Sequence, residues 1–178
     1  NGLLIPFKNI SEIIRVLADH EDSDVEIIFN KNQISFQVED IYLTSRLIDG
    51  LFPDYRQILP KDNQTQVIVL KQDLIDALRM ANVFGDKFNQ ATIVIDPSDG
   101  IFEISSKNAG VGENNTTLDA TLTGDSISLN INYKYLLDCF QSIHDDSVVL
   151  EFVNPKKPMI VKSVSDKTFL YLIMPMNR

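Results

Sequence analysis

The sequence contains no tryptophan, only one cysteine and only two histidines among its 178 residues. The single Cys139 excludes an internal disulfide and any metal site built from several cysteines, which fits a reducing compartment. No run approaches the roughly 18 apolar residues of a membrane-spanning helix, and no signal-peptide pattern opens the chain. We therefore expect a cytoplasmic protein.

Positive charge is also scarce, since 16 Lys and Arg oppose 25 Asp and Glu for a net charge of −9. Generic nucleic-acid binders depend on neutralising phosphates, so any DNA contact requires basic residues concentrated on one face. What the chain does have is 44% hydrophobic residues, enough for a substantial core. It opens on Asn1 inside an apolar segment, and we expect a piece of a longer protein.

Residues 47–60 separate two blocks of similar pattern. Pro53 and Pro60 disfavour regular structure on either side, and the polar residues 61–65 cannot pack as an element. An ordinary interdomain linker is one interpretation. However, Phe52 and Ile58 are costly to leave in water, so we expect this linker to be docked against the protein.

Hydrophobic periodicity predicts three βαβββ units in an α+β fold. The first helix carries Ile10, Ile13, Ile14 and Leu17 at the i, i+3, i+4, i+7 spacing of an amphipathic helix. The unit repeats after 64 and then 62 residues, when the three helices are superposed. The expected helices are about 6–18, 72–83 and 133–143, and the expected strands are 3–5, 25–30, 33–38, 41–47, 66–70, 91–96, 101–107, 116–123, 127–131, 148–153, 159–164 and 168–174.

Each predicted helix carries basic or amide residues opposite its apolar face. At 100° per residue, Lys8 and Arg15 lie within about 20° of each other, and Arg79 and Lys134 occupy the same face of the other two helices. On these residues alone, a solvated helix face is the favoured explanation of the pattern. Because Glu12 and its counterparts lie close to that face, any phosphate contact would be loose and sensitive to salt.

No catalytic constellation is visible, so no catalytic residue, metal site or cofactor is predicted. Cys139 occupies a core position of the third helix and is expected to pack rather than to react. His20 and His144 have no nucleophile or metal ligand at a recognisable spacing. The carboxylates 21–24 and 145–146 fall in loops, where solvated charge is the expected role.

Two motifs carry a family resemblance that covers the whole chain. The segment Thr44-Ser45-Arg46-Leu47-Ile48-Asp49-Gly50, followed by Phe52-Pro53-Asp54-Tyr55-Arg56, and the C-terminal Leu172-Ile173-Met174-Pro175-Met176 resemble the bacterial sliding clamp, the β subunit of DNA polymerase III. The resemblance implies the DNA-clamp fold, with helices on one face of antiparallel sheets. It assigns residues 1–51 to the second half of the middle domain, 52–65 to a linker and 66–178 to the C-terminal domain.

The resemblance also implies a function as a DNA replication processivity factor. In that family two protomers close into a ring around duplex DNA, and partners such as the polymerase III α subunit and the clamp loader dock a short peptide between the middle and last domains. The implied DNA-facing residues are Lys8, Arg15, Arg79 and Lys134, and the implied ring interface is Asn82, Val83 and Phe84. The implied peptide pocket contains Pro53, Ile58, Asn132, Tyr135, Pro158, Met174, Pro175 and Met176.

The same comparison indicates what the chain lacks. The first half of the middle domain would supply the other pocket wall, so we expect weakened peptide binding, no closed ring and self-association of the unpaired first unit. A peptide-binding or self-assembling β-rich module unconnected with DNA is the alternative; it predicts that Lys8, Arg15 and Arg79 do not matter. An enzyme would need a convergent polar site that the sequence does not contain.

Overall fold

The computed structural model describes residues 2–176 and divides into two compact units, Asn1–Tyr55 and Arg56–Arg178. We refer to them as the small unit and the large unit. Residue 1 of the predicted segment 1–51 and residues 177–178 of the predicted segment 66–178 lie outside the described residues. The division of the sequence at residues 52–65 stays a prediction.

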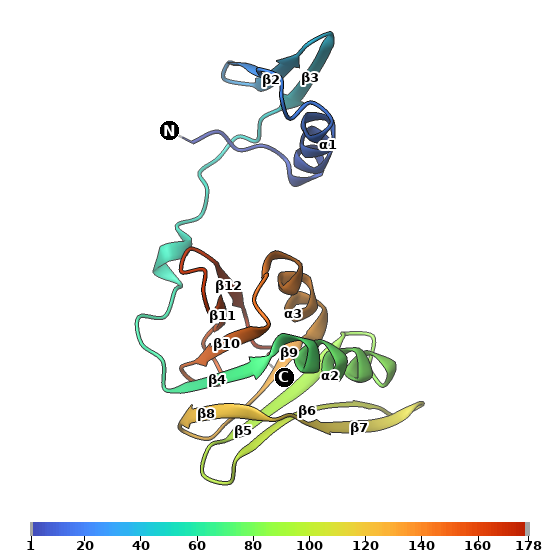
Figure 1. Cartoon of the computed structure of the whole chain (residues 1–178), viewed down its shortest axis with the longest axis vertical. Helices are drawn as coiled ribbons and strands as arrows, with labels where there is room; N and C mark the ends of the chain where they lie inside the picture. Colours follow the sequence, from blue (N-terminus) through green and yellow to red (C-terminus); the bar gives the residue numbers. More distant parts are fainter. Residues whose placement is uncertain (1, 177–178) are drawn as a thin grey trace. The chain divides into compact units, whose positions relative to one another are not determined.

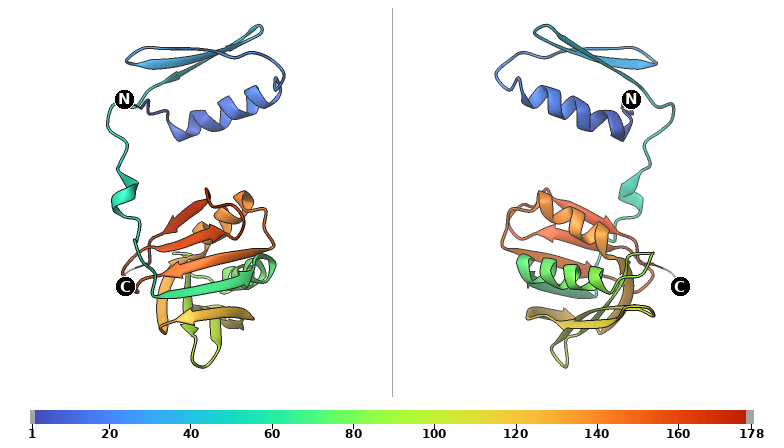
Figure 2. Two further views of the ribbon diagram at one scale, coloured as in Figure 1. Left: turned by 60° about the vertical axis from the view of Figure 1, so that its left-hand side comes forward. Right: turned by 90° about the vertical axis from the view of Figure 1, so that its right-hand side faces the viewer.

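In the small unit, one helix lies along one face of a three-stranded antiparallel sheet of order β1-β2-β3 (Figures 1 and 2). Ile13 of the helix packs with Ile34 and Phe36 of the sheet, as the helical periodicity predicted. The elements are α1 (Phe7–Ala18), β1 (Glu26–Phe29), β2 (Gln33–Val38) and β3 (Ile41–Arg46).

Two expectations for the small unit are wrong. The segment Leu3–Ile5 forms no strand; the Ile48 N–H donates a hydrogen bond to the Leu4 carbonyl at 2.8 Å. Ile14 is 61% exposed, because it is rotated by about 100° from the buried Ile13 and no element of this unit covers that side. An amphipathic pattern thus predicts which side of a helix is apolar, but it does not predict how much of that side the rest of the protein buries.

The edge strand β1 is exposed along its whole length. Ile27, Ile28 and Phe29 are 49–62% exposed although their side chains alternate between the two faces of the sheet. An unpaired apolar edge is a template for pairing with another strand. This feature supports the expectation of self-association, which stays a prediction.

In the large unit, each repeat contributes its first strand to the sheet of the other repeat. Strand β4 (Thr65–Leu70) pairs with β10 (Ser147–Phe152), and β9 (Ile127–Asn132) pairs with β5 (Gln90–Asp96). The two antiparallel sheets therefore have the orders β12-β11-β10-β4-β8 and β7-β6-β5-β9. The remaining elements are α2 (Lys71–Val83), β6 (Ile101–Asn108), β7 (Gly112–Thr117), β8 (Ala120–Gly124), α3 (Tyr133–Cys139), β11 (Met159–Ser163), β12 (Leu170–Ile173) and the 3-10 turns Tyr55–Gln57 and Phe140–Ser142.

The single strand predicted at 116–123 is two strands in different sheets. Strand β7 pairs with β6, whereas β8 pairs with β4. Between them the Leu118 N–H donates to the Phe102 carbonyl at 2.8 Å, and the Leu118 side chain enters the core. Local β-propensity does not reveal this crossing, because the residues on both sides of Leu118 are equally suited to a strand. The third helix also ends earlier than predicted, at Cys139, and continues as the 3-10 turn.

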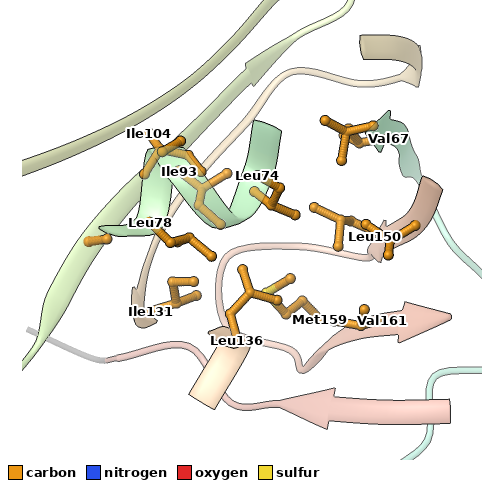
Figure 3. Close-up of a cluster of buried hydrophobic side chains, with 14 of the residues drawn as sticks. Val67, Leu74, Leu78, Ile93, Ile104, Ile131, Leu136, Leu150, Met159 and Val161 are labelled. Carbon is orange, nitrogen blue, oxygen red and sulfur yellow. The ribbon is translucent and has the colours of Figure 1, made fainter. Parts of the chain in front are cut away.

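The core of the large unit lies between the two helices and the two sheets (Figure 3). Helices α2 and α3 pack side by side (Figure 2), and Leu74, Leu78 and Leu136 point from them into this core. Cys139 is buried there too, and desolvation raises the pKa of its thiol to about 12. The thiol is therefore protonated at neutral pH, as expected of a packing residue.

Asp145 has a structural role that the sequence did not reveal. Its carboxylate accepts hydrogen bonds from the hydroxyl of Ser163 and from the hydroxyl and backbone N–H of Ser165, at 2.5 and 2.8 Å for the two Ser165 bonds. These donors hold the pKa of Asp145 well below its usual range. The loop carboxylate expected to be merely solvated therefore ties the start of β10 to the end of β11.

Candidate functional site

The linker and the last strands of the large unit form an open pocket, which we call the Met174 pocket. The linker is held to the sheet by the Gln64 N–H, which donates to the Phe152 carbonyl at 2.8 Å. The pocket has a volume of about 510 Å³. It is lined by Gln57, Ile58, Leu59, Pro60, Lys61, Asp62, Val153, Lys156, Lys157, Pro158 and Met174.

The apolar rim of this pocket is exposed. Ile58 is 54% and Met174 is 55% exposed, whereas Pro158, which lines the same pocket, is buried. Two exposed aliphatic side chains beside a buried floor form a surface that another apolar group can cover favourably. The arrangement suits an apolar side chain entering from solvent.

Three of the predicted pocket residues lie together here, namely Ile58, Pro158 and Met174. The remaining predicted residues of the large unit do not line this pocket. Asn132 caps α3 by accepting from the Lys134 N–H at 3.0 Å, and Tyr135 is exposed on that helix. Pro175 is buried, and the Met176 N–H donates to the Asn130 carbonyl at 2.7 Å. Pro53 belongs to the small unit.

Sequence reasoning missed the lysines of the pocket. Lys156 and Lys157 follow β10 in a turn whose backbone N–H groups donate to the Asn154 side chain at 2.9 and 3.1 Å. The pattern Asn154-Pro155 at the end of a predicted strand is a turn signal that could have located them. Together with Lys61, they give the pocket lining three positive charges against the single negative charge of Asp62.

The expectation that the linker is docked holds only for its second half. Leu51 is 96% and Phe52 is 69% exposed, whereas Leu59 and Pro60 are half-buried. The rings of Phe52 and Tyr55 meet edge to face with centroids 6.4 Å apart, and this contact shields them only in part.

The basic helix faces are exposed but locally paired. The Arg15 guanidinium lies 2.5 Å from Glu12, and that of Arg79 lies 3.4 Å from Asp76, each one helical turn apart. The guanidinium of Arg15 holds the pKa of Glu12 below its usual range. Lys8 and Lys134 are exposed and take part in no ion pair within residues 2–176.

The three residues predicted at a ring interface lie at the end of α2. Asn82 accepts a hydrogen bond from the Tyr133 hydroxyl at 2.6 Å, and Val83 is 59% exposed. The ring of Phe84 is half-buried, 3.6 Å from the place that a Cβ on Gly112 would occupy. These contacts fix the end of the helix and leave Val83 open to solvent.

Residues 2–176 contain no group of three or more His, Cys, Asp or Glu placed to hold a metal ion. The helices of this part include none that is long and apolar enough to cross a membrane.

Comparison with known families decides the identity of the fold. The sequence profile described as DNA polymerase III beta subunit, C-terminal domain, matches residues 56–177, and the profile of the central domain of the same subunit matches residues 1–54. The chain belongs to the DNA polymerase III beta subunit family. The boundary between the two matched domains lies beside the boundary between the small and large units.

Individual beta subunit relatives agree with this assignment. The Beta sliding clamp of Staphylococcus aureus is 28% identical over 177 residues, which is 99% of this chain and 47% of that protein. A putative DNA polymerase III beta subunit from Eubacterium rectale is 30% identical, with a TM-score of 0.85 over 100% of this chain and 48% of that one. A sliding clamp from Bartonella birtlesii bound to griselimycin is 27% identical, with a TM-score of 0.89 and the same coverage.

The comparisons confirm the predicted family and the α+β clamp fold. The beta subunit relatives are bacterial proteins about twice as long, since this chain spans about half the length of the curated relatives that it matches. None of these comparisons tests the individual site residues, which stay predictions.

Proposed function

We propose that this chain forms part of a bacterial sliding clamp, a DNA replication processivity factor that encircles duplex DNA and tethers the polymerase without catalysing a reaction. Its membership of the beta subunit family supports the proposal. The relatives named as sliding clamps are about twice as long, so the ring, its DNA and its homodimeric closure are proposals for the whole protein. We place the protein in the cytoplasm, where bacterial DNA is replicated.

The Met174 pocket carries the proposal that partner peptides dock on this chain. Its exposed Ile58 and Met174 side chains line the pocket together with the buried Pro158, so an inserted apolar side chain gains apolar contact there. A flexible thioether can repack around different peptides at little cost, which suits a site shared by several partners. The partners that we propose are the polymerase III α subunit, the clamp loader and other proteins with a clamp-binding motif.

The other predicted pocket residues extend this proposal beyond the pocket itself. Tyr135 is exposed on α3, and Met176 is half-buried against β9 through its backbone bond to Asn130. We propose that Asn132, Tyr135, Pro175 and Met176 form a second part of the docking surface and that Pro53 contributes from the linker. The Bartonella relative described as bound to griselimycin indicates that a clamp of this fold can hold a ligand.

Calorimetric titration with the peptide Gln-Leu-Ser-Leu-Phe tests the docking proposal. We expect weak binding by the wild-type chain and a loss of about 5- to 30-fold in affinity for Met174→Ala, equivalent to about 1 to 2 kcal/mol of lost apolar contact. The matched control is Met80→Ala, which truncates a methionine of similar exposure, 47%, on helix α2. Equal affinity of both variants for the peptide would contradict the assignment of the pocket.

The basic helix faces carry the proposal that the clamp lining contacts DNA. Lys8, Arg15, Arg79 and Lys134 are exposed on three helices that occupy equivalent places in the repeat. Because Glu12 and Asp76 pair with the two arginines, the attraction for phosphate is weak. Weak attraction suits a ring that must slide, since a tight grip on any phosphate would stop it.

Charge reversal separates this proposal from a DNA-independent role. We expect fluorescence anisotropy to detect weak duplex binding near 50 mM salt that falls steeply by about 200 mM, and the variant Lys8→Glu/Arg15→Glu/Arg79→Glu/Lys134→Glu to lose it. The control reverses the same number of charges at exposed sites outside the helices, namely Lys31, Lys61, Lys156 and Lys157. If both quadruple variants lose binding equally, the effect is one of net charge and the helix lining is not a DNA-facing surface.

Family membership does not favour the alternative of an interaction module unrelated to DNA. We propose Asn82, Val83 and Phe84 as part of the ring interface, supported by the exposure of Val83 at the end of α2. Self-association of the small unit through β1 remains compatible with this function, because it uses a different surface.

A further inference from the structure

A second pocket adjoins the Met174 pocket, and we call it the Lys162 pocket. The two pockets share the linker residues 59–62 and Val153, so they lie next to each other on the surface of the large unit. The Lys162 pocket has a volume of about 350 Å³. It extends over strands β10, β11 and β12, on the face of the sheet that is turned away from the core.

The floor of the Lys162 pocket is apolar. Met159 and Val161 of β11 point into the core, so their neighbours Ile160 and Lys162 point to the opposite face. Ile160 lines the pocket and is only 4% exposed. Leu170, which faces Lys162 across the β11–β12 pair, is 41% exposed. The buried Ile160 and the exposed Leu170 together give this pocket an apolar surface that suits an aliphatic side chain of a ligand.

The charge above this floor is fixed in place. The Lys162 ammonium lies 2.6 Å from Glu151 Oε2, and Glu151 Oε1 accepts from the Gln66 amide at 3.4 Å. The Glu151 side chain is only 13% exposed, whereas that of Lys162 is 38% exposed. Since an ammonium has three donors and Glu151 accepts one of them, Lys162 can donate to an acceptor arriving from solvent.

The balance of charge around the joined pockets favours an acidic ligand. Four lysines line them, namely Lys61, Lys156, Lys157 and Lys162, against the two acids Asp62 and Glu151. This is the reverse of the chain as a whole, in which acids outnumber basic residues by 25 to 16. A local excess of positive charge on an acidic protein attracts and orients an acidic partner.

We propose that the Lys162 pocket is a subsite for an acidic segment that flanks the docked peptide, with an aliphatic side chain on the exposed Leu170 and a carboxylate on Lys162. The proposal rests on the proposed function, because the Met174 pocket must hold the core of the same peptide. The subsite would rank partners that share one core motif according to their flanking residues. Charge at such a rim sets specificity and association rate more than affinity.

Extended peptides test the subsite. We compare Gln-Leu-Ser-Leu-Phe with versions that carry Asp-Leu-Glu at the amino or the carboxyl end, using calorimetry on the whole chain. We expect one extension to improve affinity about five- to tenfold at low salt and the gain to shrink at high salt. The same extension with Asn-Leu-Gln should keep only the part of the gain that comes from the leucine.

Substitutions at Lys162 and Leu170 show which side chains produce the gain in affinity. Lys162→Gln should abolish the preference for the acidic extension while the core peptide binds as before, and Lys162→Arg should retain it. The matched control is Lys107→Gln, which removes the lysine of another cross-strand ion pair, 3.1 Å from Glu113 in the other sheet. Lys162→Gln also leaves Glu151 without its cation, so a second variant that keeps this ion pair is needed. Leu170→Ser serves this purpose and should lose the part of the affinity gain that comes from the leucine of the extension.

The outcomes distinguish the two proposals. If the core peptide binds through Met174 but neither extension improves affinity, or the gain persists in both Lys162→Gln and Leu170→Ser, the subsite is wrong and the docking proposal stands. If the core peptide does not bind at all, the docking proposal and the subsite that depends on it are both overturned.

Discussion

Replacing Leu78 with alanine is expected to destabilise the large unit by about 3 to 5 kcal/mol. Leu78 is fully buried and points from α2 into the core shared by both repeats, near Ile93, Ile104 and Ile131 (Figure 3). The substitution removes apolar contacts and leaves a cavity that helices and sheets packed on both sides cannot close. Urea unfolding followed by circular dichroism gives the change in free energy.

The control for this prediction is Met80→Ala, two residues along the same helix. Met80 is 47% exposed, so its truncation is expected to cost less than about 1 kcal/mol. Because the chain has two units, the transition of the large unit must be followed separately, for example by calorimetry. Similar losses of stability for both variants would show that α2 does not present Leu78 to a tightly packed core.

Replacing Gly124 with alanine is expected to cost about 3 to 5 kcal/mol, although only one methyl group is added. Gly124 has φ +100, and a Cβ there would lie 1.8 Å from the carbonyl oxygen of Gln64. Other atoms within 2.8 Å also belong to the backbone, at Gln64 and Thr65, so no side-chain rotation can relieve the clash. The end of β8 must therefore separate from β4, with which it pairs at Thr65.

Neighbouring hydrogen bonds would be lost in the same displacement. The Asp125 N–H donates to the Gln64 carbonyl at 3.2 Å, and the Thr65 hydroxyl donates to the Asp125 carbonyl at 2.6 Å. Gly100→Ala is the matched control, because Gly100 also has a positive φ, +67, but nothing lies within 4 Å of its Cβ position. We expect it to cost only about 1 to 2 kcal/mol in thermal or urea unfolding. Equal costs at both glycines would mean that backbone conformation alone, and not close approach, requires Gly124.

The helical cores were predictable from spacing alone. Leu74, Ala77, Leu78 and Ala81 of α2 are all buried, as the i, i+3, i+4, i+7 pattern requires. The same rule misplaced Ile14 of α1, which is exposed. Periodicity assigns a residue to a side of its own helix, whereas the width of the covered stripe depends on how many strands the partner sheet contains.

The candidate site was predictable only in part. Ile58, Pro158 and Met174 were predicted from the family resemblance and do line one pocket, but Lys156 and Lys157 were not predicted. Their positions depend on a turn between β10 and β11 that brings them beside the linker, nearly a hundred residues earlier in the chain. No local sequence pattern reveals that these two lysines lie close to the linker.

The sequence by itself determined the repeated unit, the helical core faces and the family, because these follow from local periodicity and from two short motifs. Only the tertiary structure decided that each repeat lends its first strand to the other and that the chain changes sheets at Leu118. It also decided that the linker lines two adjacent pockets. The physical reason is that strand pairing and surface charge depend on residues far apart in the sequence, whose proximity is set by the burial of one shared core.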